Sequence, residues 1–137
     1  MVDPAAVTLE QARAVVEGEA FCRWWGLEVV SVGPGRCDVR LPLRAELLRP
    51  GGVLHGSGYE AAADVAAWIA LMTVVGVEPM AVTIEMKTSF LRGATTDITS
   101  TAEVLRLGRR IAFLDARTYD ADGVLCAHST LSYSRAR

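Results

Sequence analysis

The sequence contains few of the residues from which metal sites and disulfide frameworks are built. It has only two histidines and three cysteines, and Cys22, Cys37 and Cys126 show no C-x-x-C spacing. An odd number of widely spaced cysteines argues against both a disulfide framework and a zinc site. We therefore expect no catalytic metal, and we expect a reducing, cytoplasmic setting.

The chain also lacks an excess of charge of one sign. It carries 14 Lys and Arg against 16 Asp and Glu, so the formal net charge is -2 and the pI is near 5.7. Such a chain has no broad attraction to nucleic acid or to an anionic membrane, and a phosphate-bearing ligand would need a local basic cluster. The nucleotide-binding patterns G-x-x-x-x-G-K and G-x-G-x-x-G are absent as well.

No segment has the features of a signal peptide or a membrane span. The N-terminus shows no basic segment before an apolar run, and the longest uncharged stretch, residues 65–77, is shorter than a span. We expect neither export by an ordinary signal peptide nor a membrane anchor. With 137 residues, of which 51% are apolar, the chain can build one core. We predict a single domain over residues 1–137, with a loose terminus at 1–7.

The first elements follow from polar caps and aromatic pairs. Thr8, with Gln11 three residues later, matches a capping box and predicts a helix that reaches about Glu19. Trp24 and Trp25 come next. Paired large aromatics more often pack a helix onto a sheet than bind a cofactor, so we place both in the core.

Two strands and a long helix are expected in the middle of the chain. Apolar-rich runs at 26–31 and 36–43 are separated by the turn cluster Gly33-Pro34-Gly35, which predicts a hairpin. From Gly56 to about Val75 the sequence is rich in alanine and contains no proline. This segment predicts one long, largely buried helix.

After Pro79 the apolar pattern changes to a period of two, which predicts a strand. Its expected faces are Val82, Ile84, Met86 and Phe90 on one side, and Thr83, Glu85, Lys87 and Ser89 on the other. Three further strands are expected at 97–107, 110–119 and 124–133, with turns at Gly108 and Asp122-Gly123. The second half would then be an antiparallel meander.

This order of elements predicts an α+β fold class. A helix that is apolar nearly all round must be covered on more than one side, and a curved antiparallel sheet wrapped around it is the simplest cover. One sheet leaves an edge strand and one side of the helix open. A homodimer or larger assembly is therefore expected.

Asp64 is the candidate catalytic acid of the long helix. It stands between Ala61-Ala62-Ala63 and Val65-Ala66-Ala67. Burying a charge among small apolar residues is costly unless the charge is paired or used. The alternative is that Asp64 lies on a narrow, solvent-facing stripe with Glu60.

The glycine-rich segment 51–56 leads into the start of the same helix at His55-Gly56. Free N–H groups and the helix dipole favour negative charge there, and they would stabilise the oxyanion formed when an acyl carbonyl is attacked. Gly56 would let that carbonyl approach closely. Asp64 lies roughly 12 Å further along the helix, too far to act on the same carbonyl. A site shared by Gly56 of one subunit and Asp64 of another removes this objection.

These residues resemble the hotdog-fold thioesterases of the phenylacetic-acid-degradation (PaaI-like) type. The resemblance rests on Leu54-His55-Gly56 followed by Asp64, and on Thr83-Ile84-Glu85-Met86 with Ser89-Phe90-Leu91-Arg92. It runs from about Gly26 to Tyr133. It implies hydrolysis of an acyl-CoA, with no cofactor beyond the coenzyme A of the substrate, by a homodimer or homotetramer.

The resemblance also implies roles for single residues. Asp64 would act as general base on water or as nucleophile, and the Gly56 N–H would polarise the thioester carbonyl. His55 would orient the turn, and Thr83 can position the water from the neighbouring subunit. Relatives commonly have glycine where Ser57 stands and asparagine where Arg49 stands, so Arg49 receives no role; Gly93, often proline in relatives, changes only the loop.

The phosphates of coenzyme A need cations. Arg92, Arg109 and Arg110 are expected at the ends of adjacent strands, where they would bind the phosphates. Ordinary solvated charges are an equally good interpretation. The sequence does not identify the acyl group of the substrate. The small side chains of Ala62, Ala63 and Ala67 could leave room for an aryl or medium chain, whereas Trp68 and Met72 could fill that room.

Other functions are less well supported. Cys126 and His128 are expected on one strand face, but no orienting acid is evident, so they indicate a packed strand. An enoyl thioester hydratase or dehydratase on the same fold would need a His paired with an acid, and His55 lacks the proline-containing context of that branch. A non-catalytic acyl-CoA sensor is the other alternative, for which Ser57 and Arg49 are modest support.

Overall fold

The computed structural model describes residues 4–135, which contain three α-helices and two antiparallel sheets. The helices are α1 (Leu9–Glu17), α2 (Ala20–Trp25) and α3 (Gly56–Val75), with one 3-10 turn at Ala45–Leu47. The strands are β1 (Glu28–Gly33), β2 (Arg36–Leu41), β3 (Leu48–Arg49), β4 (Val53–Leu54), β5 (Val82–Phe90), β6 (Ile98–Leu107), β7 (Ile111–Asp120) and β8 (Leu125–Ser134). The main sheet has the order β1-β2-β6-β7-β8-β5, and β3 pairs with β4.

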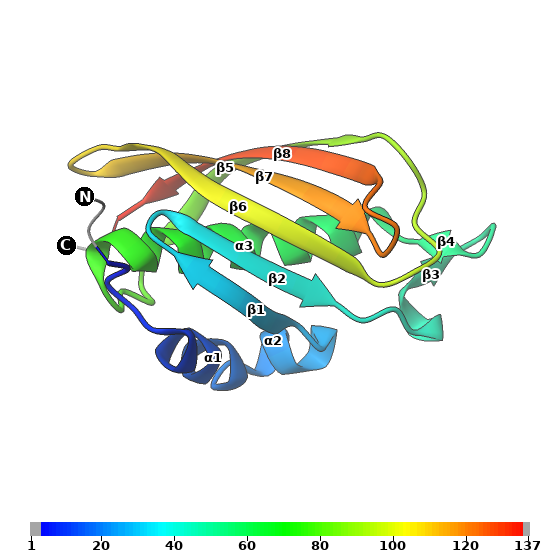
Figure 1. The fold of residues 1–137 in the computed structure, drawn as a ribbon. Coiled ribbons are helices and arrows are strands. Elements are labelled where there is room, and N and C mark those ends of the chain that lie inside the picture. Colours follow the sequence, from blue (N-terminus) through cyan, green and yellow to red (C-terminus); the bar gives the residue numbers. More distant parts are fainter. Residues whose placement is uncertain (1–3, 136–137) are drawn as a thin grey trace.

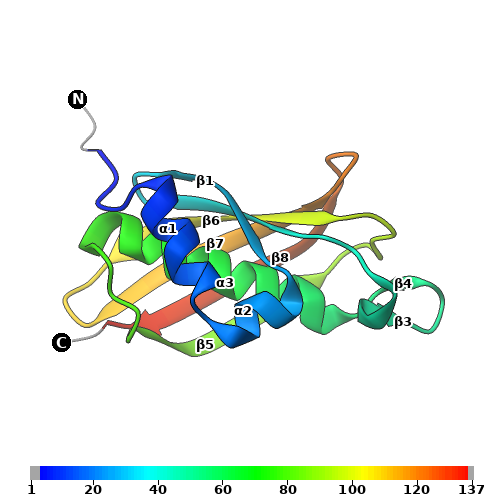
Figure 2. The same ribbon diagram turned by 90° about the horizontal axis from the view of Figure 1, so that it is seen from below.

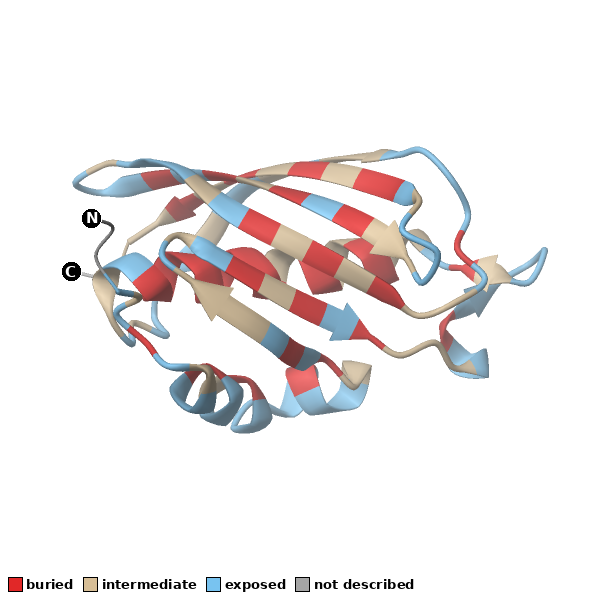
Figure 3. Ribbon diagram, viewed as in Figure 1, coloured by how far each residue is buried: buried red, intermediate tan, exposed pale blue. Residues whose placement is uncertain are grey.

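The main sheet curves around α3, which lies along its concave side (Figures 1 and 2). α1 and α2 lie on the other side of α3 beside β1 (Figure 2). Nine consecutive residues of α3, from Val65 to Thr73, are buried, and buried residues alternate along the facing strands (Figure 3). The predicted architecture, a curved antiparallel sheet around a long central helix, is confirmed.

α3 is the one helix among residues 4–135 with the length and composition to cross a membrane, and 72% of its most apolar stretch is buried inside the fold. Helix α3 therefore forms the centre of the core. Its alanines keep the helix narrow, so that the sheet packs closely against it.

Two residues of the terminus that was expected to be loose at 1–7, Ala6 and Val7, contact the rest of the fold. Residues 1–3 lie outside the described part of the chain. The Ala6 N–H donates to the Thr73 carbonyl oxygen at 2.6 Å, and Val7 is only 2% exposed. The last turn of α3 leaves carbonyl groups without helical partners, and Ala6 satisfies one of them.

The placement of Trp24 in the core is wrong. The predicted capping box at Thr8 is present, but α1 ends at Glu17 and a separate helix, α2, carries both tryptophans. Trp24 is 61% exposed, while Trp25 packs partly against the core. The Arg44 guanidinium lies 5.1 Å from the Trp24 ring centroid and donates to the carbonyl oxygens of Trp24 and Trp25 at 2.5 and 2.7 Å. This cation fixes the end of α2 without burial.

The predicted four-stranded meander is wrong for β5. Strands β6, β7 and β8 do form a meander, and Gly123, with φ of 81°, makes the expected turn before β8. β5 instead pairs with β8 at the outer edge of the sheet. Residues 91–97 carry the chain from this edge to β6 in the middle of the sheet. Among the described residues of one protomer, β5 therefore has one side free of strand partners.

The two faces of β5 also differ from the period-two prediction. A bulge between Thr83 and Glu85 shifts the register, so that Thr83 pairs with Tyr133 and Met86 pairs with Leu131. Paired residues share a face, and Tyr133 and Leu131 are both buried toward α3. Thr83 therefore faces inward with Met86, because the bulge adds one residue between them.

Candidate active site

The start of α3 is held by its first residues and by the β3–β4 ribbon before it. Gly51 and Gly52 have φ values of 100° and 75°, which let the chain reverse between the two strands. His55 is the N-cap residue, and its Nδ1 accepts a hydrogen bond from the Ser57 N–H at 3.1 Å. The Ser57 hydroxyl lies 2.8 Å from the same nitrogen. His55 and Ser57 therefore fix the turn at which the helix begins.

Gly56 presents a free donor at this helix start. It is the first residue of α3, so its N–H has no carbonyl within the helix to bind. No acceptor for it occurs among residues 4–135. The Phe90 ring lies close by: a Cβ built on Gly56 would be 3.2 Å from Phe90 Cε1. The glycine thus keeps both the donor and the space beside it accessible.

A cavity of about 390 Å³ opens beside Gly56. Tyr59 and Phe90 form part of its wall, with their rings in edge contact and centroids 5.9 Å apart. Arg49 and Arg92 line the same cavity, and both side chains are exposed. Arg49, which received no role from the sequence, therefore shares this cavity with Gly56.

The expected cluster of Arg92, Arg109 and Arg110 does not form within the protomer. Arg92 follows β5 at the end where Phe90 pairs with Ala127 of β8. Arg109 and Arg110 stand in the β6–β7 turn, at the end where β7 pairs with the last residues of β8. These ends are separated by most of the length of β8, roughly 20 Å. The three arginines are separated because Arg92 follows the end of β5 and Arg109 follows the end of β6, and these two strands run in opposite directions. Phosphate binding by each arginine stays a prediction.

Asp64 faces β5 and β8 from the first half of α3. Thr83 Oγ1 donates to Asp64 Oδ1 at 2.6 Å, and the Tyr133 hydroxyl donates to the same oxygen at 2.5 Å. The Tyr133 hydroxyl also lies 2.8 Å from the Asp64 carbonyl oxygen. Among the described residues, no group donates to Oδ2. The half-buried carboxylate points at two hydroxyls, so the alternative of a solvent-facing stripe with Glu60 is wrong.

Tyr133 belongs to this cluster and was missed from the sequence. It is 2% exposed, and burial together with the nearby Asp64 carboxylate raises the pKa of its hydroxyl far above the usual range. Tyr133 therefore stays a donor at any working pH. A tyrosine on the inward face of a strand needs a partner for its hydroxyl, but local spacing does not reveal that the partner is Asp64.

A second cavity, of about 360 Å³, opens beside Asp64. Its wall is mostly apolar and comes from α2, α3, the segment before β5, β5 itself and Tyr133 of β8, with Phe21, Val65, Trp68, Pro79 and Val82 among its residues. Ala62, Ala63 and Ala67, considered above as a source of room, are fully buried. They pack in the core instead of lining this cavity. Trp68 does line it, one helical turn after Asp64.

Gly56 and Asp64 open into different cavities of one protomer. They lie eight residues apart on the same straight element, which corresponds to a rise of roughly 12 Å. One chain therefore presents two separate half-sites, an N–H donor with two arginines and a carboxylate with two hydroxyls.

Cys126 and His128 do not form a nucleophile and base. Cys126 is fully buried, and burial raises the pKa of its thiol, so the reactive thiolate is disfavoured. His128 has an acid partner that was not evident from the sequence, because its Nε2 lies 3.1 Å from Asp115 Oδ2 across the β7–β8 pair. Within residues 4–135, no group of three His, Cys, Asp or Glu side chains could hold a metal ion.

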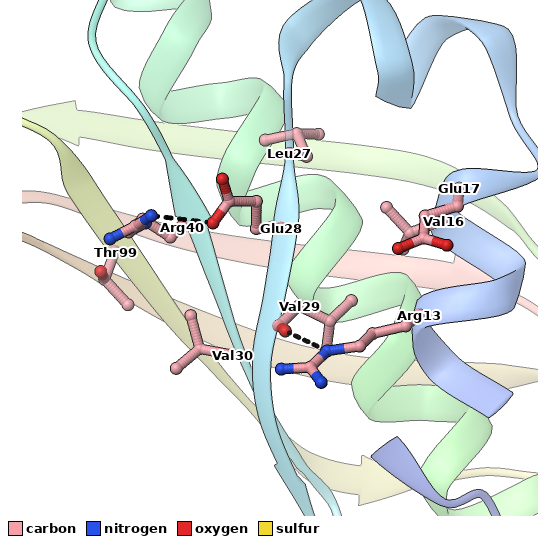
Figure 4. Close-up of a pocket in the computed structure, with 9 residues that line it drawn as sticks. All are labelled: Arg13, Val16, Glu17, Leu27, Glu28, Val29, Val30, Arg40 and Thr99. Atoms are coloured by element: carbon pink, nitrogen blue, oxygen red, sulfur yellow. Dashed lines mark hydrogen bonds and ion pairs between the residues drawn. The ribbon is translucent and has the colours of Figure 1, made fainter. Parts of the chain in front are cut away.

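A further hollow, of about 540 Å³, lies between α1 and β1, away from both half-sites (Figure 4). Three of its charged groups are engaged with the protein: Arg40 pairs with Glu28 at 2.9 Å, and Arg13 Nε donates to the Val29 carbonyl oxygen at 3.1 Å. None of the residues expected to carry chemistry lines it. We attribute it to the packing of a short helix along an edge strand.

Comparison with known proteins relates this geometry to one family. Residues 51–127 match the thioesterase superfamily, a range that includes Gly56, Asp64 and Thr83. A protein of Saccharolobus solfataricus proposed to be an esterase is 33% identical over 118 residues, which cover 85% of this chain and 84% of that protein.

Two solved structures are similar to this chain. The phenylacetic acid degradation protein PaaI of Thermus thermophilus is 28% identical with a TM-score of 0.77, and the match covers 86% of this chain and 100% of the other. The PaaI protein of Escherichia coli, 22% identical, has a TM-score of 0.84 over 93% of this chain and 92% of its own, a likeness of fold.

Proposed function

Because this chain belongs to the thioesterase superfamily, has the hotdog fold and is a hydrolase that acts on thioesters, we propose that it cleaves acyl- or aryl-CoA to a free acid and CoA. The observation that carries the proposal is the Asp64 carboxylate. One of its oxygens accepts from two hydroxyls, while no group among residues 4–135 donates to the other, and the carboxylate borders an apolar cavity. A carboxylate held in this way is suited to take a proton from water.

The site would be completed by a second copy of the chain. β5 is an edge strand, and its Val82, Ile84 and Phe90 side chains are 55%, 54% and 54% exposed. An apolar edge of this kind favours pairing with another strand. Pairing of two subunits along β5 would bring Asp64 of one subunit toward Gly56 of the partner subunit. Gly56 and Asp64, which are too far apart along α3 of one chain, would then meet in one site.

Hydrolysis would then proceed by general base catalysis. Asp64 Oδ2 takes a proton from water as the water oxygen bonds to the thioester carbonyl carbon. The carbonyl oxygen becomes an oxyanion and accepts from the free Gly56 N–H of the partner subunit. Collapse of the tetrahedral intermediate breaks the C–S bond, and the proton held by Asp64 passes to the leaving thiolate. The products are the carboxylic acid and the thiol, and Asp64 is again ionised.

Thr83 would position the attacking water. Its only hydroxyl proton is donated to Asp64 Oδ1, so its oxygen keeps lone pairs that can accept from water. Water held between Thr83 Oγ1 and Asp64 Oδ2 would be oriented for attack. The sequence suggested that Thr83 acts from the neighbouring subunit, but its hydroxyl bonds Asp64 of its own chain. In this scheme Thr83 and Asp64 therefore act from the same subunit, opposite Gly56 and His55 of the partner subunit.

The coenzyme A portion would leave the site along the Gly56 cavity, past Arg49 and Arg92. We expect the double variant Arg49→Ala/Arg92→Ala to raise KM for acyl-CoA about tenfold, because two charge-assisted contacts to phosphate are lost. KM for the same acyl group on N-acetylcysteamine, which has no phosphates, should change little. Thiol release measured with both substrates therefore distinguishes a loss of phosphate binding from a general loss of thioester binding.

The matched control for the arginine pair is Arg106→Ala, which removes an exposed arginine of β6 that lines neither cavity. It should leave both KM values unchanged. Equal losses with both thioesters in the double variant would mean that Arg49 and Arg92 do not bind phosphate.

The acyl group would occupy the apolar cavity beside Asp64. Phe21 is 53% exposed and reaches this cavity from α2. We expect Phe21→Ala to lower kcat/KM for medium-chain and aryl-CoA about three- to tenfold, since apolar contact is lost. Acetyl-CoA hydrolysis should be little affected.

Trp24→Ala is the control for Phe21, because Trp24 is an exposed aromatic of the same helix that does not line the cavity. A uniform loss over all chain lengths in Phe21→Ala would contradict an acyl pocket there. The whole proposal is tested by thiol release over short, medium, long and aromatic acyl-CoAs. Hydration of an enoyl thioester would remove the double bond without releasing thiol.

A further inference from the structure

The Asp64 carboxylate has an asymmetric environment. Both donors that reach it, Thr83 Oγ1 at 2.6 Å and the Tyr133 hydroxyl at 2.5 Å, end on Oδ1. No described group donates to Oδ2. The two oxygens of the carboxylate are therefore unequal before any substrate binds.

The contact from Tyr133 differs in kind from the contact from Thr83. The Tyr133 hydroxyl lies within hydrogen-bond distance of the Asp64 side chain and also of the Asp64 carbonyl oxygen, at 2.8 Å. One group thus spans the backbone and the side chain of the same residue. This restricts rotation of the Asp64 side chain relative to α3.

Tyr133 is itself fixed. It is 2% exposed on the inward face of β8, and it pairs in register with Thr83 of β5. The bulge after Thr83 lies on β5, and it turns the Thr83 hydroxyl to the side on which the Tyr133 hydroxyl lies. The two donors therefore converge on Oδ1 through sheet register and not through flexible loops.

We propose that Tyr133 is a positioning residue for the thioesterase reaction, which holds Asp64 Oδ1 so that Oδ2 alone is presented to the attacking water. This rests on the proposed function of Asp64. The Tyr133 ring contributes to the wall of the cavity beside Asp64, but its hydroxyl bonds Asp64, and in this scheme it acts only through the orientation of the carboxylate. Because its hydroxyl stays protonated, it never opposes Asp64 with a second negative charge.

The test is Tyr133→Phe, which keeps the ring and removes the hydroxyl. We expect kcat to fall about 10- to 100-fold, since a small misplacement of a catalytic group costs on this order. KM should stay within about twofold, because phenylalanine keeps the ring that lines the acyl cavity and the coenzyme A contacts are unchanged. Placing 4-aminophenylalanine at position 133 restores a donor of similar reach and should recover most of kcat.

A double-mutant cycle shows whether Tyr133 acts through Asp64. In an Asp64→Asn background, Tyr133→Phe should lower the residual kcat no further. An additive loss would overturn the positioning role, and so would a Tyr133→Phe enzyme with unchanged kcat. Full activity of Asp64→Asn alone would instead overturn the proposed function, so the two failures are distinguishable.

Thr118→Val is the matched control for loss of a buried hydroxyl. Thr118 is fully buried on β7 and bonds Ser100 at 2.6 Å, far from Asp64 along the sheet. It should lower the thermal unfolding temperature and leave kcat unchanged. A similar loss of kcat in Thr118→Val would show that any weakened core reduces turnover, and it would remove the case for Tyr133.

Discussion

The Asp64→Asn enzyme is expected to lose at least about 10³-fold in kcat, at the upper end of what a general base contributes. Asparagine has the same shape, and its Oδ1 can still accept from Thr83 and Tyr133. The fold should therefore be kept. An amide carries no negative charge and takes no proton from water, so the chemical step fails while acyl-CoA still binds. Thiol release gives kcat, and calorimetry with a non-hydrolysable acyl-CoA ether gives affinity.

Glu60→Gln provides the control for removal of a carboxylate from α3. Glu60 lies one turn before Asp64 and lines neither of the two cavities. Its replacement should leave turnover unchanged. If Asp64→Asn kept turnover within a few fold of the wild type, Asp64 would not be the catalytic base, and the reaction would have to use another group.

Much of the fold could be predicted because its signals are local. The helix at Gly56–Val75 follows from alanine content and the absence of proline, and its all-round apolar character requires a wrapping sheet. Turn residues mark the hairpins at Gly35 and Gly123, both of which have positive φ. These features depend on neighbours in the chain, so one sequence suffices to read them.

The pairing of β5 could not be predicted in this way. Strand periodicity says that residues 82–90 form a strand, but it does not say which strand will be the neighbour. In the structure β5 pairs with β8, and a bulge after Thr83 changes the face of that residue. Both features depend on contacts distant in sequence. The inward position of Thr83 and its pairing with Tyr133 follow from them.

Only the part of the candidate site that lies on one local element could be predicted from the sequence. Asp64, His55 and Gly56 lie on one helix, and their spacing fixes where they stand. Their catalytic roles stay predictions until tested. Partners on other elements, above all Tyr133, required the register of the sheet. The expected arginine cluster depends on strand direction: β5 and β6 run in opposite directions, so Arg92 after β5 and Arg109 after β6 lie at opposite ends of the sheet.

Gly56→Pro is expected to lower kcat about 10²- to 10³-fold, the usual effect of removing one oxyanion donor. Proline removes the N–H, and it is well tolerated as the first residue of a helix. His55 already has φ of -63° and ψ of 145°, which suits the residue before a proline. α3 should therefore form normally. Gly56→Ala is the control, because it keeps the N–H and adds only a Cβ against the half-exposed Phe90 ring.

Hybrid dimers test whether the site is shared between subunits. In a dimer of one Gly56→Pro chain and one Asp64→Asn chain, one of the two shared sites contains both an intact Gly56 and an intact Asp64. Hybrids purified through two different tags should therefore regain about half of the wild-type activity per dimer, although each parent dimer is nearly inactive. If Gly56 and Asp64 of the same chain formed the site, both sites of the hybrid would be defective. Hybrids as inactive as their parents would thus rule out the shared site, even if Asp64 is the base.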